Sequence, residues 1–334
     1  MRRLLVIVTS GLLLLQAAPV QAWNARGHMT VAAVAWSKMS AKSRARAADL
    51  IKRNPRFAAW TKGVPARRKA QIAFVKAATW PDEIRGMVCA SGPDCYQDDG
   101  YTPADAGSGL NIGYADHRLR RYWHFKDLPF SADGTPLKPP FAPNAQTQIE
   151  AFSASLASPQ LTEDAKSYNL TWLLHLVGDV HQPLHATARF SQQFPDGDKG
   201  GNGEVVCEPA PARCQTSGKF AEKLHGLWDN AIGTNSSPAA AIAKAARLVS
   251  EADRRRGFMA QVMRRTNLDA PPAAWMAESF QLARKYVYVP PIGDGKGPHF
   301  PDAAYKVNMG SIASQQILIA GERLARLLDR AFAP

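Results

Sequence analysis

Hydrophobic residues recur along most of the chain at steps of three and four, the spacing that places them on one face of a helix. Segments in which apolar and polar residues alternate, as strands require, are nearly absent, and residues 204–207 are the best candidate. Strands that alternate with helices are missing, so a parallel sheet is not expected. The pattern predicts an all-α fold with little or no β structure. The expected helices cover residues 29–53, 66–80, 144–156, 162–181, 219–232, 238–252, 276–287 and 305–328.

Long loops interrupt this helical pattern. They are rich in Gly, Pro, Asp and Ser and cover residues 89–113, 131–143, 191–218 and 289–301. Loops of this length inside a compact domain usually have a function. The candidate site residues described below lie on both sides of each of the first three loops. We therefore expect a single domain over residues 23–334, and not two separate halves.

The first 22 residues have the pattern of a secretory signal peptide. Met1–Arg3 is basic, Leu4–Leu15 is mostly apolar, and Val20 and Ala22 supply the small residues before a cleavage site. The apolar run is shorter than the roughly 20 residues that span a membrane, which makes an N-terminal anchor the weaker interpretation. Cleavage after Ala22 would give an exported chain, periplasmic or extracellular, that begins at Trp23.

Export would place the cysteines in an oxidising compartment, where disulfides are more common than reactive thiols. The four residues Cys89, Cys95, Cys207 and Cys214 allow three pairings. Both close pairs lie in loop sequence, which favours Cys89–Cys95 and Cys207–Cys214. A zinc site made by all four thiolates is the alternative, but neither spacing has the short form common in such sites.

The composition excludes a disordered or collagen-like chain, since 46% of the residues are hydrophobic and 21% are charged. Lys and Arg number 41 against 28 Asp and Glu, for a formal net charge of +13. This excess suits a polyanionic partner such as nucleic acid, or an anionic membrane surface.

The candidate chemistry lies in pairs of His and Asp spaced four residues apart. His175 and Asp179 share a face of a predicted helix that is otherwise apolar, and two buried polar groups there are costly unless something binds them. A proline then interrupts the helix, which lets His185 turn back towards the same point. His225 and Asp229 form a second pair. Imidazole and carboxylate without thiolate suit zinc, and fit manganese or nickel less well.

Signatures of several other enzyme classes are absent from the sequence. It has no H-E-x-x-H, which argues against a thermolysin-type peptidase, and no His-Asp dipeptide of the kind common in metal phosphohydrolases. It also has neither a phosphate-binding loop nor a G-x-S-x-G nucleophile elbow.

Three further segments belong with the His–Asp pairs: W-N-A-R-G-H at 23–28, T-W-P-D-E-I-R at 79–85 and Y-W-H-F-K-D at 122–127. In the order, spacing and flanking residues of these blocks, the chain resembles the trinuclear-zinc, single-strand-specific nucleases of the S-one/P-one type. That family is related in fold to bacterial zinc phospholipase C. The resemblance covers the whole mature chain, from Trp23 to the C-terminal helices.

The resemblance implies three zinc ions per chain, held by nine ligand residues. It assigns the first ion to Asp82, His124, His175 and Asp179. It assigns the second ion to His185, His225 and Asp229. It assigns the third ion to His28, to Asp179 as a shared ligand, and to the free amine and carbonyl oxygen of Trp23.

The resemblance also implies the substrate contacts and the reaction. Arg85 matches the arginine that faces the transition-state phosphate, and Asp127 and Asn230 match polar residues of the phosphate site. Phe125 matches an aromatic residue that stacks on a base, and Asn202 ends the Gly-Gly-Asn turn of the family. The implied activity is hydrolysis of single-stranded DNA and RNA to 5′-nucleotides, with 3′-nucleotides as further substrates. No stable protein partner is implied, so a monomer is expected.

Two features depart from the family pattern. Pro81 replaces the small residue often found before the metal-binding aspartate, a change that we expect to be harmless. A local Cys207–Cys214 bridge would differ from the longer-range bridge of fungal relatives.

Two other functions compete with the nuclease. A zinc phospholipase C with the same metals would need exposed apolar residues around the cleft, whereas this chain has a strong positive charge and Phe125 beside a ligand. A non-catalytic zinc or nucleic-acid binding protein would not need Arg85 and Asn230.

Overall fold

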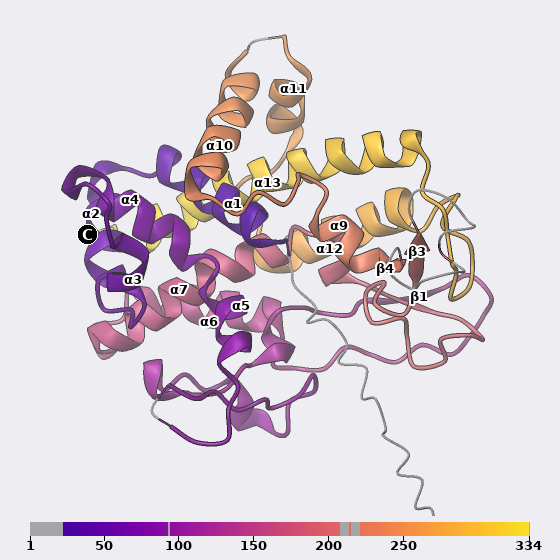
Figure 1. Cartoon of the computed structure of the whole chain (residues 1–334), viewed down its shortest axis with the longest axis horizontal. Coiled ribbons are helices and arrows are strands. Elements are labelled where there is room, and N and C mark those ends of the chain that lie inside the picture. The colour runs from indigo at the N-terminus through magenta and orange to yellow at the C-terminus, as the bar shows by residue number, and fades with distance from the viewer. Residues whose placement is uncertain (1–22, 93, 208–213, 215–220, 255, 334) are drawn as a thin grey trace, which may run out of the picture.

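The computed structural model of the chain describes residues 23–92, 94–207, 214, 221–254 and 256–333 (Figure 1). The signal peptide predicted over residues 1–22 lies outside the described residues and stays a prediction. Within the described part, none of the helices combines the length and the apolar character that crossing a membrane would need.

Helices provide most of the secondary structure. The longer α-helices are α1 (Ala25–Lys38), α2 (Ala41–Ile51), α4 (Ala66–Ala77), α6 (Ala145–Leu156), α7 (Glu163–Asp179), α10 (Pro238–Asp253), α11 (Phe258–Arg265), α12 (Pro272–Leu282) and α13 (Ala303–Ala331). The shorter ones are α3 (Phe57–Thr61), α5 (Trp80–Glu83) and α9 (Leu224–Asp229). Helical turns of other types are η1 (Ile84–Met87), η2 (Ala106–Gly109), η3 (Gly113–Ala115), η4 (Arg121–Trp123), η5 (Pro183–Ala186) and the π-helical η6 (Ala283–Val287).

The β structure amounts to two small sheets of two strands each among the described residues. In the first, β1 (Pro129–Ser131) pairs in parallel with β2 (Ala188–Phe190). In the second, β3 (Val205–Cys207) pairs antiparallel with β4 (Ala221–Lys223). The predicted all-α fold and the strand expected near residues 204–207 are therefore both confirmed.

Helix α7 lies at the centre of the core. Its first turn follows Thr162, whose hydroxyl accepts a hydrogen bond from the Ala165 amide, and Glu163 and Asp164 place negative charge where the helix dipole favours it. Every residue from Lys166 to Asp179 is buried. The helix packs against α6, α2, α1 and α13. In Figure 1 the long α13 (yellow) runs across the molecule above α7, and the loop-rich segment between α5 and α6 lies at the bottom of the view.

The largest differences between the predicted and the observed helices lie in two segments. The segment 29–53 contains two helices, because Ser40 has an extended backbone and its side chain accepts a hydrogen bond from the Ser43 amide, which starts α2. The segment 219–232 is helical only over α9, because Ala221–Lys223 pairs with β3. Both differences concern where helices begin and end, and neither changes the fold class.

Both favoured disulfides are present in the structure, Cys89–Cys95 and Cys207–Cys214. Each closes a short loop, as the close spacing in the sequence predicted.

Candidate metal centre

The candidate centre is built on the C-terminal half of α7. His175 and Asp179 lie one helical turn apart and are fully buried, with His175 Nε2 3.3 Å from Asp179 Oδ2. The other ring nitrogen of His175, Nδ1, donates to the carbonyl oxygen of Ala78 at 2.8 Å. Because a carbonyl oxygen can only accept, Nδ1 carries the hydrogen and Nε2 presents a lone pair to the site.

Side chains from three other elements converge on Asp179 and His175. His28 of α1 places Nε2 3.3 Å from Asp179 Oδ1. His124, directly after η4, places Nδ1 3.1 Å from Asp179 Oδ2 and 3.0 Å from His175 Nε2. Asp82 of α5 lies 3.8 Å from His175 Nε2. The two oxygens of Asp179 therefore face histidines from different parts of the chain.

Asp82 reaches the site through the short helix α5. Pro81 occupies the first turn of this helix, where no backbone N–H is needed for an intrahelical bond. The departure at Pro81 noted in the sequence is thus compatible with the local structure.

A second cluster lies beside the first. His225 and Asp229 come from α9, with His225 Nε2 3.7 Å from Asp229 Oδ2. His185 comes from η5, which Pro183 begins after the end of α7, and it joins this second cluster and not the group of His175 and Asp179. The amide of Gln182 donates to Asp229 Oδ1 at 2.8 Å and so fixes that carboxylate.

The arrangement of His185 and His225 is that of two ligands of one cation. Nδ1 of His185 donates to the carbonyl oxygen of His124 at 2.7 Å, and Nδ1 of His225 donates to that of Gly200 at 2.6 Å. Each Nε2 therefore carries a lone pair, and the two Nε2 atoms lie 3.0 Å apart. Two lone pairs at this distance repel each other unless they share a cation.

The electrostatics of the first cluster point the same way. Burial raises the pKa of the Asp179 carboxyl well above its ordinary value, and the nearby Asp82 carboxylate adds to that shift. Burial also lowers the pKa of His175 to about 3 and that of His124 well below 6.5. The histidines are therefore neutral, and protonation cannot supply the positive charge that a buried carboxylate needs.

Several polar atoms of the first cluster have no hydrogen-bond partner among the described residues. They include both ring nitrogens of His28, His124 Nε2 and Asp179 Oδ1. Folded proteins rarely leave buried polar atoms unsatisfied. These unpartnered nitrogen and oxygen atoms, gathered around the Asp179 carboxylate, fit the ligand shell of a metal ion.

The described residues contain three groups of donors that could hold a metal ion. They are His28 with His175 and Asp179; Asp82 with His124 and His175; and His185 with His225 and Asp229, and the ligand atoms within each group lie within 4.8 Å of one another. Imidazole nitrogens and carboxylate oxygens suit zinc. Eight of the nine predicted ligand residues therefore lie together in geometry that fits metal ions.

Trp23, the ninth predicted ligand residue, lies next to this cluster. Its side chain is fully buried and packs against Gly27, where an added Cβ would come within 2.5 Å of Trp23 Cβ. An added Cβ at Gly178 would lie 2.8 Å from His28 Nδ1 and 3.8 Å from Trp23 Cδ1, so the indole and the His28 ring both cover this glycine of α7.

A model of the S1/P1 nuclease family matches residues 23–333. The chain belongs to the S1/P1 nuclease family. It is therefore a nuclease, a hydrolase that acts on the phosphodiester bonds of nucleic acids. A comparison with curated proteins finds no significant match.

In this S1/P1 nuclease, Arg85 lies at the edge of the first cluster. Its NH2 group is 3.0 Å from Asp82 Oδ1, and only 6% of its side chain is exposed. Its Nε and NH1 groups have no hydrogen-bond partner among the described residues. The guanidinium therefore has donors available next to a candidate metal ligand.

Asn230 connects the second cluster to the N-terminal segment. It follows α9 directly, and its Oδ1 accepts a hydrogen bond from Asn24 Nδ2 at 2.8 Å, while its own amide donates to Glu222 at 3.1 Å. Sequence reasoning missed Asn24, which also caps α1 by accepting a hydrogen bond from the Gly27 amide. Its position, directly before a helix that contains a predicted ligand, was the available signal.

The Gly-Gly-Asn turn positions His225. Lys199, Gly200 and Gly201 all have positive φ angles, of 57°, 59° and 77°. A Cβ at Gly200 would lie 2.3 Å from the Leu184 carbonyl oxygen, so only glycine fits there. The Gly200 carbonyl oxygen can then accept the hydrogen bond from the His225 ring. The side-chain amide of Asn202 donates to the Lys199 carbonyl oxygen at 2.7 Å.

Phe125 and Asp127 follow His124 and are both half-buried. The Phe125 ring packs edge-on against Phe141, with 5.7 Å between the ring centres. Burial raises the pKa of the Asp127 carboxyl to about 8, and the neighbouring Asp198 contributes to this shift. Asp127 is not a member of the three donor groups found among the described residues.

Proposed function

We propose that this protein is an exported, zinc-dependent endonuclease that hydrolyses single-stranded DNA and RNA to 5′-phosphorylated products, and that it also removes the phosphate of 3′-nucleotides. Family membership gives the reaction class. The observation that carries the zinc dependence is the convergence of three His and Asp donor groups, with two lone pairs facing each other between His185 and His225.

We assign three zinc ions to these donors together with Trp23. Asp82, His124, His175 and Asp179 would hold the first ion, and His185, His225 and Asp229 the second. His28, Asp179 and the amine and carbonyl oxygen of Trp23 would hold the third. Asp179 suits a shared ligand because its two oxygens face His28 on one side and His124 on the other.

When bound, zinc ions supply an activated water nucleophile near neutral pH and positive charge that stabilises the transition state. The side chains of the protein arrange the substrate around them. Arg85 would donate to the phosphate through the groups that have no partner among the described residues, and its pairing with Asp82 fixes where the guanidinium lies. Such a contact grows stronger as negative charge develops on the phosphate oxygens. Asn230 and Asp127 would line the same phosphate site.

A preference for single strands would follow from Phe125. Phe125 is only partly buried and follows His124 directly, so an unstacked base beside the centre could lie against its ring. A duplex hides the face of each base, whereas a single strand presents it. Asn202 would contact the substrate from the neighbouring turn.

Export would complete the ligand set of the third metal ion. If a signal peptide is removed after residue 22, Trp23 gains a free amine, and the adjacent Asn24 is already held by hydrogen bonds to Asn230 and Gly233. The two disulfides fit a periplasmic or extracellular protein. We also propose that the protein acts as a monomer, with no stable protein partner.

One assay tests the proposed function. Purified protein that begins at Trp23 is incubated with single-stranded DNA, single-stranded RNA, duplex DNA, a 3′-nucleotide and phosphatidylcholine, each with and without a metal chelator. We expect cleavage of both single strands to 5′-phosphorylated products, release of phosphate from the 3′-nucleotide, and loss of all activity with chelator that zinc restores. Hydrolysis of phosphatidylcholine in preference to nucleic acid, or chelator-resistant cleavage, would contradict the proposal.

A further inference from the structure

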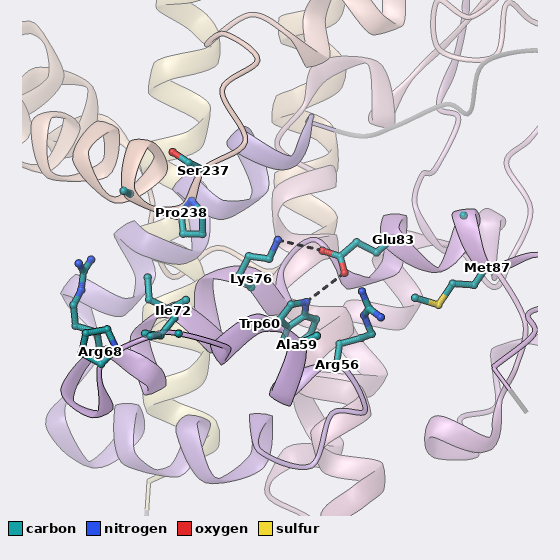
Figure 2. A pocket seen from close by; sticks show the side chains of 15 residues that line it. Arg56, Ala59, Trp60, Arg68, Ile72, Lys76, Glu83, Met87, Ser237 and Pro238 are labelled. Carbon is teal, nitrogen blue, oxygen red and sulfur yellow. Dashed lines mark hydrogen bonds and ion pairs between the residues drawn. The ribbon is translucent and has the colours of Figure 1, made fainter.

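A groove of about 770 Å³ is lined by residues of α3, α4, α5 and η1 and by residues 237–239 (Figure 2). Asp82 belongs to a donor group of the centre, whereas the next residue, Glu83, lines the groove. Likewise, Arg85 contacts Asp82, whereas Gly86 and Met87 line the groove. The α5–η1 segment is therefore a wall shared by the groove and the centre.

The chain segment that forms most of this groove is basic. Residues 54–81 contain six Lys or Arg residues and no Asp or Glu. Three cations line the groove: Arg56 and Arg68 are exposed and form no ion pair among the described residues, and Lys76 is half-buried. Arg56 and Arg68, which no carboxylate among the described residues compensates, attract a polyanion.

The acidic group that lines the groove, Glu83, is already engaged. Its carboxylate accepts hydrogen bonds from the Thr79 hydroxyl at 2.6 Å and from the Trp60 indole N–H at 3.3 Å, and it lies 3.7 Å from Lys76 Nζ. Figure 2 shows Trp60 and Lys76 pointing to this carboxylate from two sides. The carboxylate is thus fixed within the wall, and Arg56 and Arg68 are left available.

The rest of the lining is largely apolar. Val64 and Pro65 come from the turn between α3 and α4, Ile72 comes from α4, and Met87 comes from η1. A surface of apolar side chains edged by cations suits a strand with unpaired bases, which combines apolar ring faces with a charged backbone.

We propose that this groove binds part of the single-stranded substrate at a distance from the bond that is cut, with Arg56 and Arg68 contacting backbone phosphates. The proposal rests on the proposed function and extends it from one scissile phosphate to a longer strand. Because the two sites share the α5–η1 wall, the proposal places the strand across this wall, with the scissile phosphate at the centre and another part of the strand in the groove. The groove would therefore favour long strands over short ones.

The test compares a long substrate with one too short to use the groove. The long one is a single-stranded oligonucleotide of about 20 nucleotides, more than the roughly 4–16 that single-strand-binding folds cover. The short one is a dinucleotide, whose single phosphate is the scissile one, so that no phosphate remains for the groove. The variants are Arg56→Gln, Arg68→Gln and the double variant, each loaded with zinc. The control is Lys69→Gln, which changes an exposed cation of α4 outside the groove lining.

We expect the groove variants to raise KM for the long substrate while kcat stays the same. One phosphate contact to a single strand contributes a slope of about 0.7 to the dependence of log affinity on log salt, or about fivefold between 1 M and 0.1 M salt. At 0.1 M salt, kcat/KM should therefore fall about fivefold in each single variant and about 25-fold in the double variant. Near 1 M salt, all three variants should be as active as the wild type. Hydrolysis of the dinucleotide should not change.

The ratio of the two substrates separates this proposal from the proposed function. Wild-type cleavage of the dinucleotide reports on the centre alone, whereas the loss specific to the long strand reports on the groove. Equal losses on both substrates, an equal loss in Lys69→Gln, or unchanged KM for the long strand in the double variant would overturn the groove assignment. Wild-type protein that cleaved neither substrate would contradict both proposals.

Discussion

Replacing Asp179 by asparagine should do more damage to metal binding than any other single change. This carboxylate is fully buried, and its two oxygens face His28 on one side and His124 and His175 on the other. Asparagine has nearly the same shape but no charge. The substitution therefore removes one negatively charged ligand from two of the three proposed zinc sites at once, while the cluster of His185, His225 and Asp229 keeps all its ligands.

The size of the effect can be bounded from the zinc ligands of other proteins. Loss of a group that only orients a ligand costs about 10–100-fold in metal affinity. Asp179 is proposed as a direct ligand, and its burial prevents water from replacing it, so the loss at both sites should exceed about 100-fold, or about 2.7 kcal/mol. At a free zinc concentration about tenfold above the wild-type dissociation constant, the weakened sites would then be only about one-tenth occupied.

The assay is zinc content per chain after dialysis against buffered zinc, measured by atomic emission. We expect close to three ions in the wild type, close to one in Asp179→Asn, and close to two in the control His225→Ala, which affects a single site. Circular dichroism checks that each variant is folded. An Asp179→Asn protein that retains three zinc ions and near-normal turnover would refute the shared-ligand assignment.

Three other changes test the remaining roles. Arg85→Ala should lower kcat by about 10²–10³-fold without loss of zinc, since its proposed partner is the phosphate; a rise in KM alone would reassign it to substrate binding. Phe125→Ala should slow oligonucleotide cleavage, by an amount equivalent to about 1–3 kcal/mol, but not hydrolysis of a phosphodiester without bases; equal losses would make it a packing residue. A glycine added before Trp23 should lower zinc content by about one ion and reduce nuclease rate, because an amide nitrogen is a poor ligand; full zinc and full rate in that protein would exclude the terminal amine.

Much of the fold could be predicted from the sequence because its helices carry local signals. Asn144 and Thr162 each cap a helix that begins at the next residue, and the periodic apolar positions that follow give the helix its extent. The break at Ser40 was missed because residues on both sides of it are good helix formers. The strand β4 was missed because it depends on pairing with β3, about 16 residues earlier along the chain, which no local pattern reveals.

The candidate site likewise contains residues that a local sequence pattern reveals and others that it does not. The pairs His175 with Asp179 and His225 with Asp229 were visible because spacing on one helix fixes them in space. The partners that orient these histidines were not visible, because the Ala78 and Gly200 carbonyls belong to the backbone and any residue type has one. Gln182 was overlooked for a different reason, since an amide beside a proline has no distinctive spacing from the carboxylate that it holds.

The position of the centre within α7 explains why fold and site are so closely linked. Most helices present a polar face to water, whereas α7 is buried on all sides from Lys166 to Asp179 and still contains His175. Burying an ionised Asp179 without a cation would weaken the core of the protein, because water is excluded and the neutral histidines supply no positive charge. Residues that bind the metal ions are therefore also residues that allow this helix to occupy the core, and the same substitutions should affect stability and catalysis together. Arg56 and Arg68 lie on the surface and contribute nothing to that core, so their role in strand binding can be measured separately from the stability of the fold.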